Sequence, residues 1–192
     1  MMTETDAAGA MRFIVEVGML KRAKRTGWWI AGISEPESIA DHSFRTAITG
    51  TVLAAMEGVD AARVALMCVL HDTQETRVGD ISRIGKRYVK TADNPSVTAD
   101  QVAACPSPVA DTITSAVAEY EAGTTAEAIV ARDADKLECL VQAVEYQRQG
   151  VTTVQSWIDN CRAALKTDSA HRLADAAIAG DPVAWLTAGQ ND

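Results

Sequence analysis

Two of the three histidines in this 192-residue chain stand beside a carboxylate. His71 is followed directly by Asp72 at the end of the most apolar stretch of the sequence, and His42 follows Asp41 in a different segment. Burying a carboxylate without a partner costs free energy, so the pair at 71–72 must be satisfied by a hydrogen bond or by a metal ion. From these residues alone, both possibilities stay open.

Two further acids lie close to His71 along the chain. If the helix continues past His71, Glu75 lies one turn beyond it and faces the same direction. Gly79 and Asp80 follow at a predicted turn, which brings another carboxylate within reach. Glu75 and Asp80 are therefore candidate proton-transfer residues.

The segment from Arg132 to Glu138 introduces carboxylates into a predicted helix that is otherwise apolar. Asp133 lies at the edge of the main apolar stripe, whereas Asp135 belongs to a second face of small residues. Helical periodicity favours Asp135 only slightly as the inward-facing acid.

Imidazole nitrogens and carboxylate oxygens together suit a borderline or hard divalent ion. Four such ligands on a six-coordinate ion leave positions for water and for a phosphate oxygen. An ion bound there would lower the pKa of water from about 15.7 toward roughly 7, which is the chemistry of phosphoester hydrolysis. The sequence thus predicts one divalent ion per chain (Mn²⁺, Co²⁺, Fe²⁺ or Zn²⁺, with Mg²⁺ also compatible).

Helices should carry these residues, because strand signals are nearly absent. Aromatic residues make up 5% of the chain, and the β-branched residues fall mostly at helical spacing. The pattern predicts helices over 8–21, 34–56, 61–75, 108–120, 125–149, 154–165 and 169–178, loops over 25–33 and 77–97, and a weakly specified tail from 180.

Local signals define two of these helices. Ser34, followed by a proline and by Glu37, predicts the start of the second helix. Its apolar face is expected to consist of residues four apart: Ala40, Phe44, Ile48, Val52 and Met56. Asp60 should cap the next helix, whose Val64–Leu70 run is apolar all round and therefore central.

We therefore expect an all-α fold, a single compact helical bundle that forms one domain over residues 1–192. This length is sufficient for one hydrophobic core. The four cysteines include no Cys-x-x-Cys pair. Cys68 and Cys139 fall in apolar helical stretches, where buried free thiols are expected.

Charge and hydropathy restrict the partners. The net charge is −8, and no run of five or six basic residues offers a track for a nucleic-acid polymer. An acidic surface does not attract anionic membranes. The polar N-terminus lacks the apolar core of a signal peptide, and no apolar run reaches transmembrane length. A cytoplasmic protein that binds small molecules is the expectation.

Four blocks of the sequence resemble the HD-domain superfamily, whose ligand signature is H…HD…D. The blocks are 25–28 (RTGW), 36–42 (PESIADH), 71–80 (HD, a glutamate and GD) and 133–138 (DADKLE). They are most similar to the bacterial 5'-deoxynucleotidases and to related HD-domain proteins of archaea and eukaryotes. The resemblance extends from about Phe13 to Ile178.

The resemblance implies roles for individual residues. It implies that one divalent ion is bound by His42, His71, Asp72 and Asp135, so Asp135 rather than Asp133 is the fourth ligand. It also matches Glu75 and Asp80 to catalytic carboxylates, Trp28 to a tryptophan that orients the phosphate, and 80–83, including Ser82 and Arg83, to a substrate-contacting turn. The family further implies a homodimer.

One position departs from the family pattern. An arginine directly precedes the tryptophan in the bacterial deoxynucleotidases, whereas this chain has Gly27. Arg25, Arg45, Arg83 or Lys86 would have to supply the missing positive charge for the phosphate. Phosphoester hydrolysis is therefore implied more firmly than a strict preference for 5'-deoxymononucleotides.

The leading hypothesis is hydrolysis of a (deoxy)nucleoside 5'-monophosphate. One alternative is a phosphohydrolase for a modified nucleotide or a nucleoside triphosphate in secondary metabolism. Another is an alarmone hydrolase acting on guanosine 3'-diphosphates, although Thr76 stands where those enzymes have a second acid. A dinuclear phosphodiesterase would need more histidines than the chain has. A metal-stabilised nucleotide-binding regulatory protein is the non-enzymatic alternative.

Overall fold

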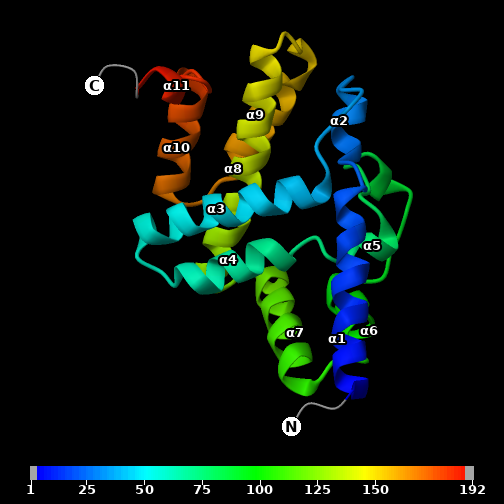
Figure 1. Cartoon of the computed structure of the whole chain (residues 1–192). Helices are drawn as coiled ribbons and strands as arrows, with labels where there is room; N and C mark the ends of the chain where they lie inside the picture. The colour runs from blue at the N-terminus through cyan, green and yellow to red at the C-terminus, as the bar shows by residue number, and fades with distance from the viewer. Residues whose placement is uncertain (1–3, 189–192) are drawn as a thin grey trace.

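A computed structural model describes residues 4–188, which contain helices, turns and one isolated β-bridge but no extended strand. The predicted all-α helical bundle is confirmed (Figure 1). The helices are α1 (Glu4–Val17), α2 (Thr26–Ile30), α3 (Ile39–Glu57), α4 (Ala61–Leu70), α5 (Glu75–Val78), α6 (Asn94–Val102), α7 (Ser107–Ala122), α8 (Ala126–Arg148), α9 (Gln155–Ala164), α10 (Asp168–Ala179) and α11 (Trp185–Ala188), with short 3₁₀ helices at Gly18–Lys21, Gly85–Arg87 and Thr152–Val154.

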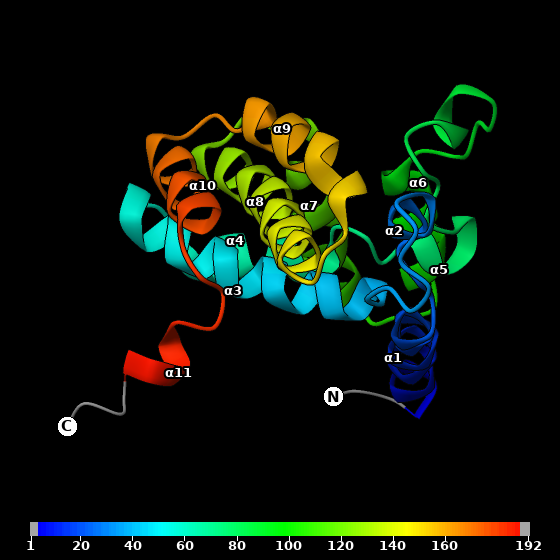
Figure 2. The same cartoon turned by 90° about the horizontal axis from the view of Figure 1, so that it is seen from above.

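Helix α8 is the central element. It packs against α3, α4, α7, α9 and α10, and Figure 2 shows it between α3 and α4 on one side and α9 and α10 on the other. The Thr125 side chain caps its start by accepting a hydrogen bond from Ala128 N at 3.1 Å. Because α8 is surrounded, its acidic residues at 133, 135 and 138 are all buried.

Helices α3 and α4 meet α8 at a close three-way contact. A Cβ atom at Gly50 of α3 would lie 2.7 Å from Cys68 Sγ of α4 and 3.5 Å from Ala134 Cβ of α8. A larger side chain there would force the helices apart. Glycine thus allows the close packing that brings α3, the end of α4 and α8 together.

The isolated bridge holds the segment before α2 against the start of α3. It pairs Lys24 with Ser38. Arg25 N donates to Glu37 O at 3.1 Å, and Ile39 N donates to Ala23 O at 2.9 Å. Residues 23–30 are thereby fixed beside the helix that carries His42.

Several predicted boundaries are confirmed to within a few residues, namely those of the helices predicted over 108–120, 125–149, 154–165 and 169–178. The first helix is shifted, running from Glu4 to Val17, and a 3₁₀ turn follows it. Residues 1–3 and 189–192 of the predicted domain lie outside the described range.

The predicted start of the second helix at Ser34 was wrong. The helix begins at Ile39, where Ser38 Oγ accepts from Asp41 N at 3.1 Å and Asp41 Oδ2 accepts from Ser38 N at 2.9 Å. This reciprocal capping box satisfies two amides that would otherwise lack partners. Ser34 has the same spacing to Glu37 but precedes the helix.

Three other expectations need correction. The loop predicted over 25–33 contains α2, and the loop predicted over 77–97 ends within α6, which Asp93 caps by accepting from Ser96 N at 2.9 Å. The helix predicted over 61–75 ends at Leu70, with turns before α5. Glycine and proline marked the first two regions as loops, because turn residues also occur at helix starts.

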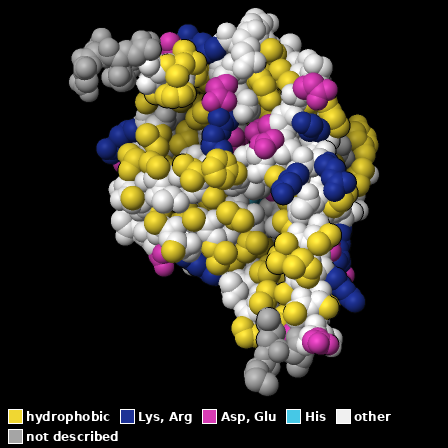
Figure 3. Space-filling model, in the orientation of Figure 1, with side chains coloured by type: hydrophobic (Ala, Val, Ile, Leu, Met, Phe, Trp, Pro, Cys, Tyr) yellow, Lys and Arg dark blue, Asp and Glu magenta, His cyan; other side chains and the backbone are white. Residues whose placement is uncertain are grey.

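The predicted apolar face of α3 is exposed rather than buried. Phe44, Ile48, Val52 and Met56 are between 46% and 69% exposed, and they contribute to the hydrophobic band across the molecule in Figure 3. The buried side of α3 instead carries small or polar residues, including His42, Thr46 and Gly50. Ile39 and Leu53 are the large apolar residues that α3 buries, and its small residues allow close packing against the neighbouring helices.

Within residues 4–188, no helix combines the length and the apolar character that crossing a bilayer requires.

Candidate active site

Two buried histidines from different helices meet at the centre of the bundle. His42 lies on α3 and His71 caps the end of α4, with their ring centroids 5.4 Å apart. Asp135 Oδ1 of α8 lies 3.2 Å from His42 Nε2 and 3.8 Å from His71 Nε2. Asp72 Oδ2 lies 3.8 Å and 3.2 Å from the same two nitrogens. Four residues from three parts of the sequence thus converge on one point.

The environment of His71 favours a cation at this point. Its Nδ1 donates to Cys68 O at 2.7 Å, which leaves Nε2 with a free lone pair. Nε2 is buried and has no hydrogen-bond partner among the described residues, because the nearby Asp72 oxygen lies within ion-pair distance but outside hydrogen-bonding geometry. A lone pair that faces two carboxylates is repelled unless a positive ion lies between them. The residues present therefore fit a divalent ion with mixed nitrogen and oxygen ligands.

His42 is held by a carboxylate on its other side. Its Nδ1 is hydrogen-bonded to Glu138 Oε2, which directs Nε2 toward Asp135. Burial and the charge of Arg25 lower the pKa of His42, but the hydrogen bonds to Asp135 and Glu138 outweigh them and raise it to about 10. A carboxylate behind a ligating histidine is the usual arrangement for fixing its ring and tautomer.

The two aspartates of α8 have different surroundings. Asp133 accepts from Lys166 N at 3.0 Å, from Thr167 N at 2.7 Å and from Thr167 Oγ1 at 2.8 Å, so it anchors the start of α10. Asp135 faces the histidines and accepts from Lys136 Nζ at 2.6 Å and Tyr120 Oη at 3.4 Å. Periodicity could not separate the two aspartates, whereas these contacts do.

Nearby charges lower the pKa values of both aspartates in the cluster, Asp72 and Asp135. Burial raises the pKa values of Asp72 and Asp135, but nearby positive groups lower them more strongly. In the metal-free chain, where the two histidines can carry a second proton, these groups are Lys136 and the histidines for Asp135, and the histidines and Arg25 for Asp72; a bound ion would take the place of those protons. Both aspartates are therefore ionised at neutral pH, as metal ligands must be.

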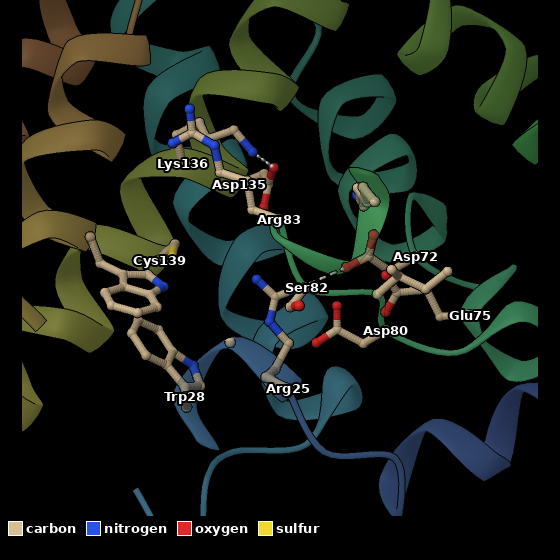
Figure 4. A pocket seen from close by; sticks show the side chains of 14 residues that line it. Arg25, Trp28, Asp72, Glu75, Asp80, Ser82, Arg83, Asp135, Lys136 and Cys139 are labelled. Atoms are coloured by element: carbon tan, nitrogen blue, oxygen red, sulfur yellow. Dashed lines mark hydrogen bonds and ion pairs between the residues drawn. The ribbon is translucent and has the colours of Figure 1, made fainter. Parts of the chain in front are cut away.

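A pocket of about 350 Å³ opens directly onto this cluster. Figure 4 shows Asp72, Glu75 and Asp80 on one side of it, Trp28 and Cys139 on the other, and Arg25 between them. Arg25 Nη1 donates to Asp72 Oδ2 at 3.3 Å. Burial, followed by the charges of Asp72 and Asp80, raises the pKa of Glu75 to about 9. The raised pKa favours the protonated form of Glu75 in the metal-free chain.

Asp80 also borders the pocket, but its side chain has a structural role as well. Its Oδ2 accepts from Thr26 N at 2.5 Å and from Thr26 Oγ1 at 3.1 Å, at the first residue of α2. Gly79 precedes it with φ of 75°, a conformation that L side chains rarely adopt. The turn therefore fixes Asp80 against α2 as well as beside Glu75.

Most of the predicted substrate contacts line the pocket: Arg25, Trp28, Ser82, Arg83 and Lys86. Trp28 is also a buried core residue that packs edge-on against Tyr146 and donates to Glu37 Oε1 at 2.9 Å. Arg83 and Lys86 form no ion pair within residues 4–188. Positive charge is thus available at the rim of the pocket.

Arg45 does not line the pocket, so its predicted contact with the substrate finds no support. Its guanidinium donates to Glu138 at 3.0 Å, to Glu145 at 2.7 Å and to Gln142 at 2.7 Å. Arg45 is instead held on the outer side of Glu138. It therefore supports the carboxylate that orients His42.

Sequence reasoning missed several residues of the site: Glu37, Tyr120, Lys136, Glu138 and Trp157. Glu138 lies three residues after Asp135, on the same side of α8, and its helical spacing could have identified it. The Tyr120 ring packs 5.2 Å from that of His71, and Trp157 packs 5.8 Å from Trp28. Only the tertiary fold brings these two aromatic residues to the site.

Two relatives resemble this chain in sequence over most of its length. The 5'-deoxynucleotidase hdd1 of Schizosaccharomyces pombe is 33% identical over 154 residues, covering 77% of each chain. The 5'-deoxynucleotidase HDDC2 of Dictyostelium discoideum is 31% identical over 166 residues, covering 79% of this chain and 87% of its own.

A solved structure is similar over most of the chain. It is a predicted metal-dependent phosphohydrolase from Magnetospirillum magnetotacticum MS-1, with a TM-score of 0.65 and 28% identity, covering 91% of this chain and 96% of its own. The family model described as HD domain matches residues 17–176. This chain belongs to the HD domain family.

Proposed function

We propose that this chain is a metal-dependent phosphomonoester hydrolase that removes the 5'-phosphate from a (deoxy)nucleoside monophosphate. The observation that carries the proposal is the convergence of His42, His71, Asp72 and Asp135 at the base of a pocket with positive side chains at its rim. The relatives named 5'-deoxynucleotidase support the choice of substrate.

His42 Nε2, His71 Nε2 and the carboxylates of Asp72 and Asp135 would hold one divalent ion (Mn²⁺, Co²⁺, Fe²⁺, Zn²⁺ or Mg²⁺). Such an ion, when bound, supplies Lewis-acid activation of water and of the phosphate. Glu138 and the Nδ1–H of His71 keep the two imidazoles oriented for this purpose. The chain's own residues thus provide a complete ligand set for one ion.

The other residues of the pocket have separate roles in proton transfer, in phosphate binding and in positioning. Glu75, whose pKa is raised to about 9 in the metal-free chain, would serve as the acid that donates a proton to the departing sugar oxygen. Arg25, Arg83 and Lys86 offset the negative charge of the phosphate. Asp80 orients the turn and the start of α2, and through them Arg25.

Release of inorganic phosphate tests the proposal. The protein is stripped of metal, reconstituted separately with each ion, and assayed with mono-, di- and triphosphates of ribo- and deoxynucleosides. We expect monophosphates to be hydrolysed only with metal present. A guanosine 3'-diphosphate is assayed in parallel for release of pyrophosphate, and cleavage of this substrate alone would favour the alarmone hydrolase instead. The threonine at position 76, in place of the second acid of the alarmone hydrolases, disfavours that outcome.

We further propose that two copies of the chain associate through the exposed face of α3 formed by Phe44, Ile48, Val52 and Met56. Large exposed apolar patches commonly mark interfaces, and a twofold axis lets one such stripe pack against its copy. Figure 3 shows further exposed hydrophobic side chains beside it on α1.

Sedimentation of single variants tests the dimer. The change Ile48→Glu should convert a dimer into a monomer, whereas Ala118→Glu on the exposed side of α7 should not. A wild-type chain that sediments as a monomer at all concentrations would refute the dimer.

We also propose that residues 1–192 form one HD domain and that the protein works in the cytoplasm. Its four cysteines are unpaired, and Cys68 and Cys161 are buried. Free thiols of this kind are typical of a reducing compartment. Fractionation of cells that express the full chain would test its location.

A further inference from the structure

A second and larger cavity continues from the pocket of the metal cluster. It has a volume of about 1010 Å³ and lies between residues 82–87 and helix α9. The two cavities share a boundary formed by Gly27, Ser82, Arg83, Lys136, Cys139 and Trp157. The second cavity is an open groove, since Asn160, Ala164 and Ile84 of its lining are exposed, and a ligand bound at the cluster can extend along it.

Gly27 stands at this boundary and keeps it open. A Cβ atom there would lie 3.6 Å from Trp157 Nε1, which is ordinary van der Waals contact. Any longer side chain would begin at that point, between the two cavities. The departure from the family pattern noted in the sequence thus lies at the boundary between the two cavities, where a long side chain would narrow the passage.

The walls of the second cavity suit a flat, partly polar group. Trp157 lies on one wall, held by its packing against Trp28, and the apolar residues Ile84 and Ala164 adjoin it. The side chains of Asn160 and Ser156 also line the cavity; both are exposed and make no hydrogen bond within residues 4–188, so both are free to contact a ligand. An indole surface next to an unpaired amide is the combination that recognises nucleobases, by stacking and by hydrogen bonding to the base edge.

The volumes of the two cavities also support a nucleoside as the ligand of the second cavity. Small-molecule sites usually measure about 300–1,000 Å³, and the pocket at the cluster, at about 350 Å³, is at the lower end of this range. The second cavity has room for a nucleoside and for substituents on its base.

We propose that the second cavity holds the nucleoside of the substrate, with the base against Trp157 and its polar edge on Asn160, and that Gly27 sets the size of nucleoside that can enter. This inference rests on the proposed phosphohydrolase function. It predicts that helix α9 determines which base is bound. It also predicts that nucleotides with an enlarged base are accepted as substrates.

Nucleoside binding to the metal-free protein tests the inference without any turnover. Calorimetric titration with deoxynucleosides, which lack phosphate, should show binding to the wild-type chain. Filling the cavity with Ala164→Phe, or closing the passage with Gly27→Arg, should weaken it by about tenfold or more. Asp159→Phe is the matched control, because Asp159 is exposed on α9 and lines neither cavity. Circular dichroism confirms that each variant is folded.

Kinetics gives a second readout. The ratio of kcat/KM for a deoxynucleoside monophosphate to that for phenyl phosphate, which has no nucleoside, should fall about tenfold in Ala164→Phe. Asn160→Ala should raise KM for nucleotides while leaving kcat nearly constant.

The outcomes separate the two proposals. Phosphate release by the wild type, with unchanged nucleoside affinity and an unchanged ratio in Ala164→Phe, would overturn the nucleoside site and leave the hydrolase intact. The absence of deoxynucleoside binding to the wild type would overturn it equally. Nucleoside binding that Ala164→Phe abolishes, without phosphate release from any nucleotide, would support the site and refute the hydrolase.

Discussion

Glu138 lies behind His42, hydrogen-bonded to its Nδ1, while Nε2 of the same ring faces Asp135. Arg45 in turn holds Glu138 from the outer side at 3.0 Å. The orientation of one candidate ligand thus depends on a carboxylate that lines neither cavity.

Replacing Glu138 should therefore weaken metal binding without removing a ligand. We expect Glu138→Gln to reduce metal affinity by about 10–100-fold, the usual effect of losing such a supporting carboxylate. Competition with a chelator of known affinity measures this change. Glu145→Gln is the control, since Glu145 contacts Arg45 but not His42. Equal affinities in both variants would mean that Glu138 does not orient the ring.

The neighbouring aspartates of α8 should respond differently to the same substitution. Asp135→Asn should abolish stoichiometric metal binding and activity while the metal-free protein remains folded. Asp133→Asn should leave metal content unchanged but destabilise the fold by about 0.5–2 kcal/mol, because it weakens the anchor at the start of α10. Elemental analysis and chemical denaturation on the same preparations measure both effects. The reverse pattern would assign the metal ligand to Asp133.

Glu75 should make the stability of the metal-free protein depend on pH. Its pKa is raised in the folded state from 4.5 to about 9, first by burial and then by Asp72 and Asp80. Its contribution to the free energy of unfolding is therefore fully present below pH 4.5 and is lost as pH rises toward about 9.

Glu75→Gln should remove this dependence, so that the variant is more stable than the wild type at pH 8. Denaturation of chelator-treated protein across this pH range provides the measurement. The same change should reduce turnover by about 10²–10⁴-fold in the metal-loaded protein. Wild-type and variant stability curves that run parallel would show that Glu75 is not protonated in the folded state.

Asp80 has two roles that a pair of variants can separate. Asp80→Asn should lower kcat by about 10²–10⁴-fold if its carboxylate takes part in proton transfer. Thr26→Val removes only the hydroxyl that donates to Asp80 and keeps the backbone contact. A comparable loss of kcat in both variants would indicate that Asp80 acts by positioning α2 and Arg25. Normal metal content in each variant is the control.

The sequence predicted most of the candidate site residues from short, well-spaced blocks, and the fold brings these blocks to one pocket. His71, Asp72 and Glu75 are close in the chain, and they border one pocket even though the helix between them is interrupted by turns. Helical periodicity favoured Asp135 over Asp133 only slightly, and the family resemblance implied Asp135; the contacts of Asp133 at the start of α10 agree with that choice. Arg45 was misplaced because charge alone does not reveal which acids surround it.

The inner face of α3 could not be predicted from hydrophobic periodicity. Periodicity identifies a stripe of large apolar residues, here Phe44 to Met56, and assumes that the stripe is buried. The packed face instead uses His42, Thr46 and Gly50, whose small or polar side chains carry little hydrophobic signal. The cavity beside α9 was equally hidden, because Gly27 and Asn160 are far apart in the chain and only the fold places them together.

The close contact at Gly50 sets the spacing between helices that the metal ligands depend on. Gly50 lies two turns along α3 from His42, and its missing side chain lets α3 rest against Cys68, three residues before His71. Even one added methyl group would push against Cys68 Sγ and tilt α3 away from α4 and α8. The distance between the two histidines therefore depends on a glycine that does not line the pocket. Substitutions at Gly50 are expected to cause loss of metal.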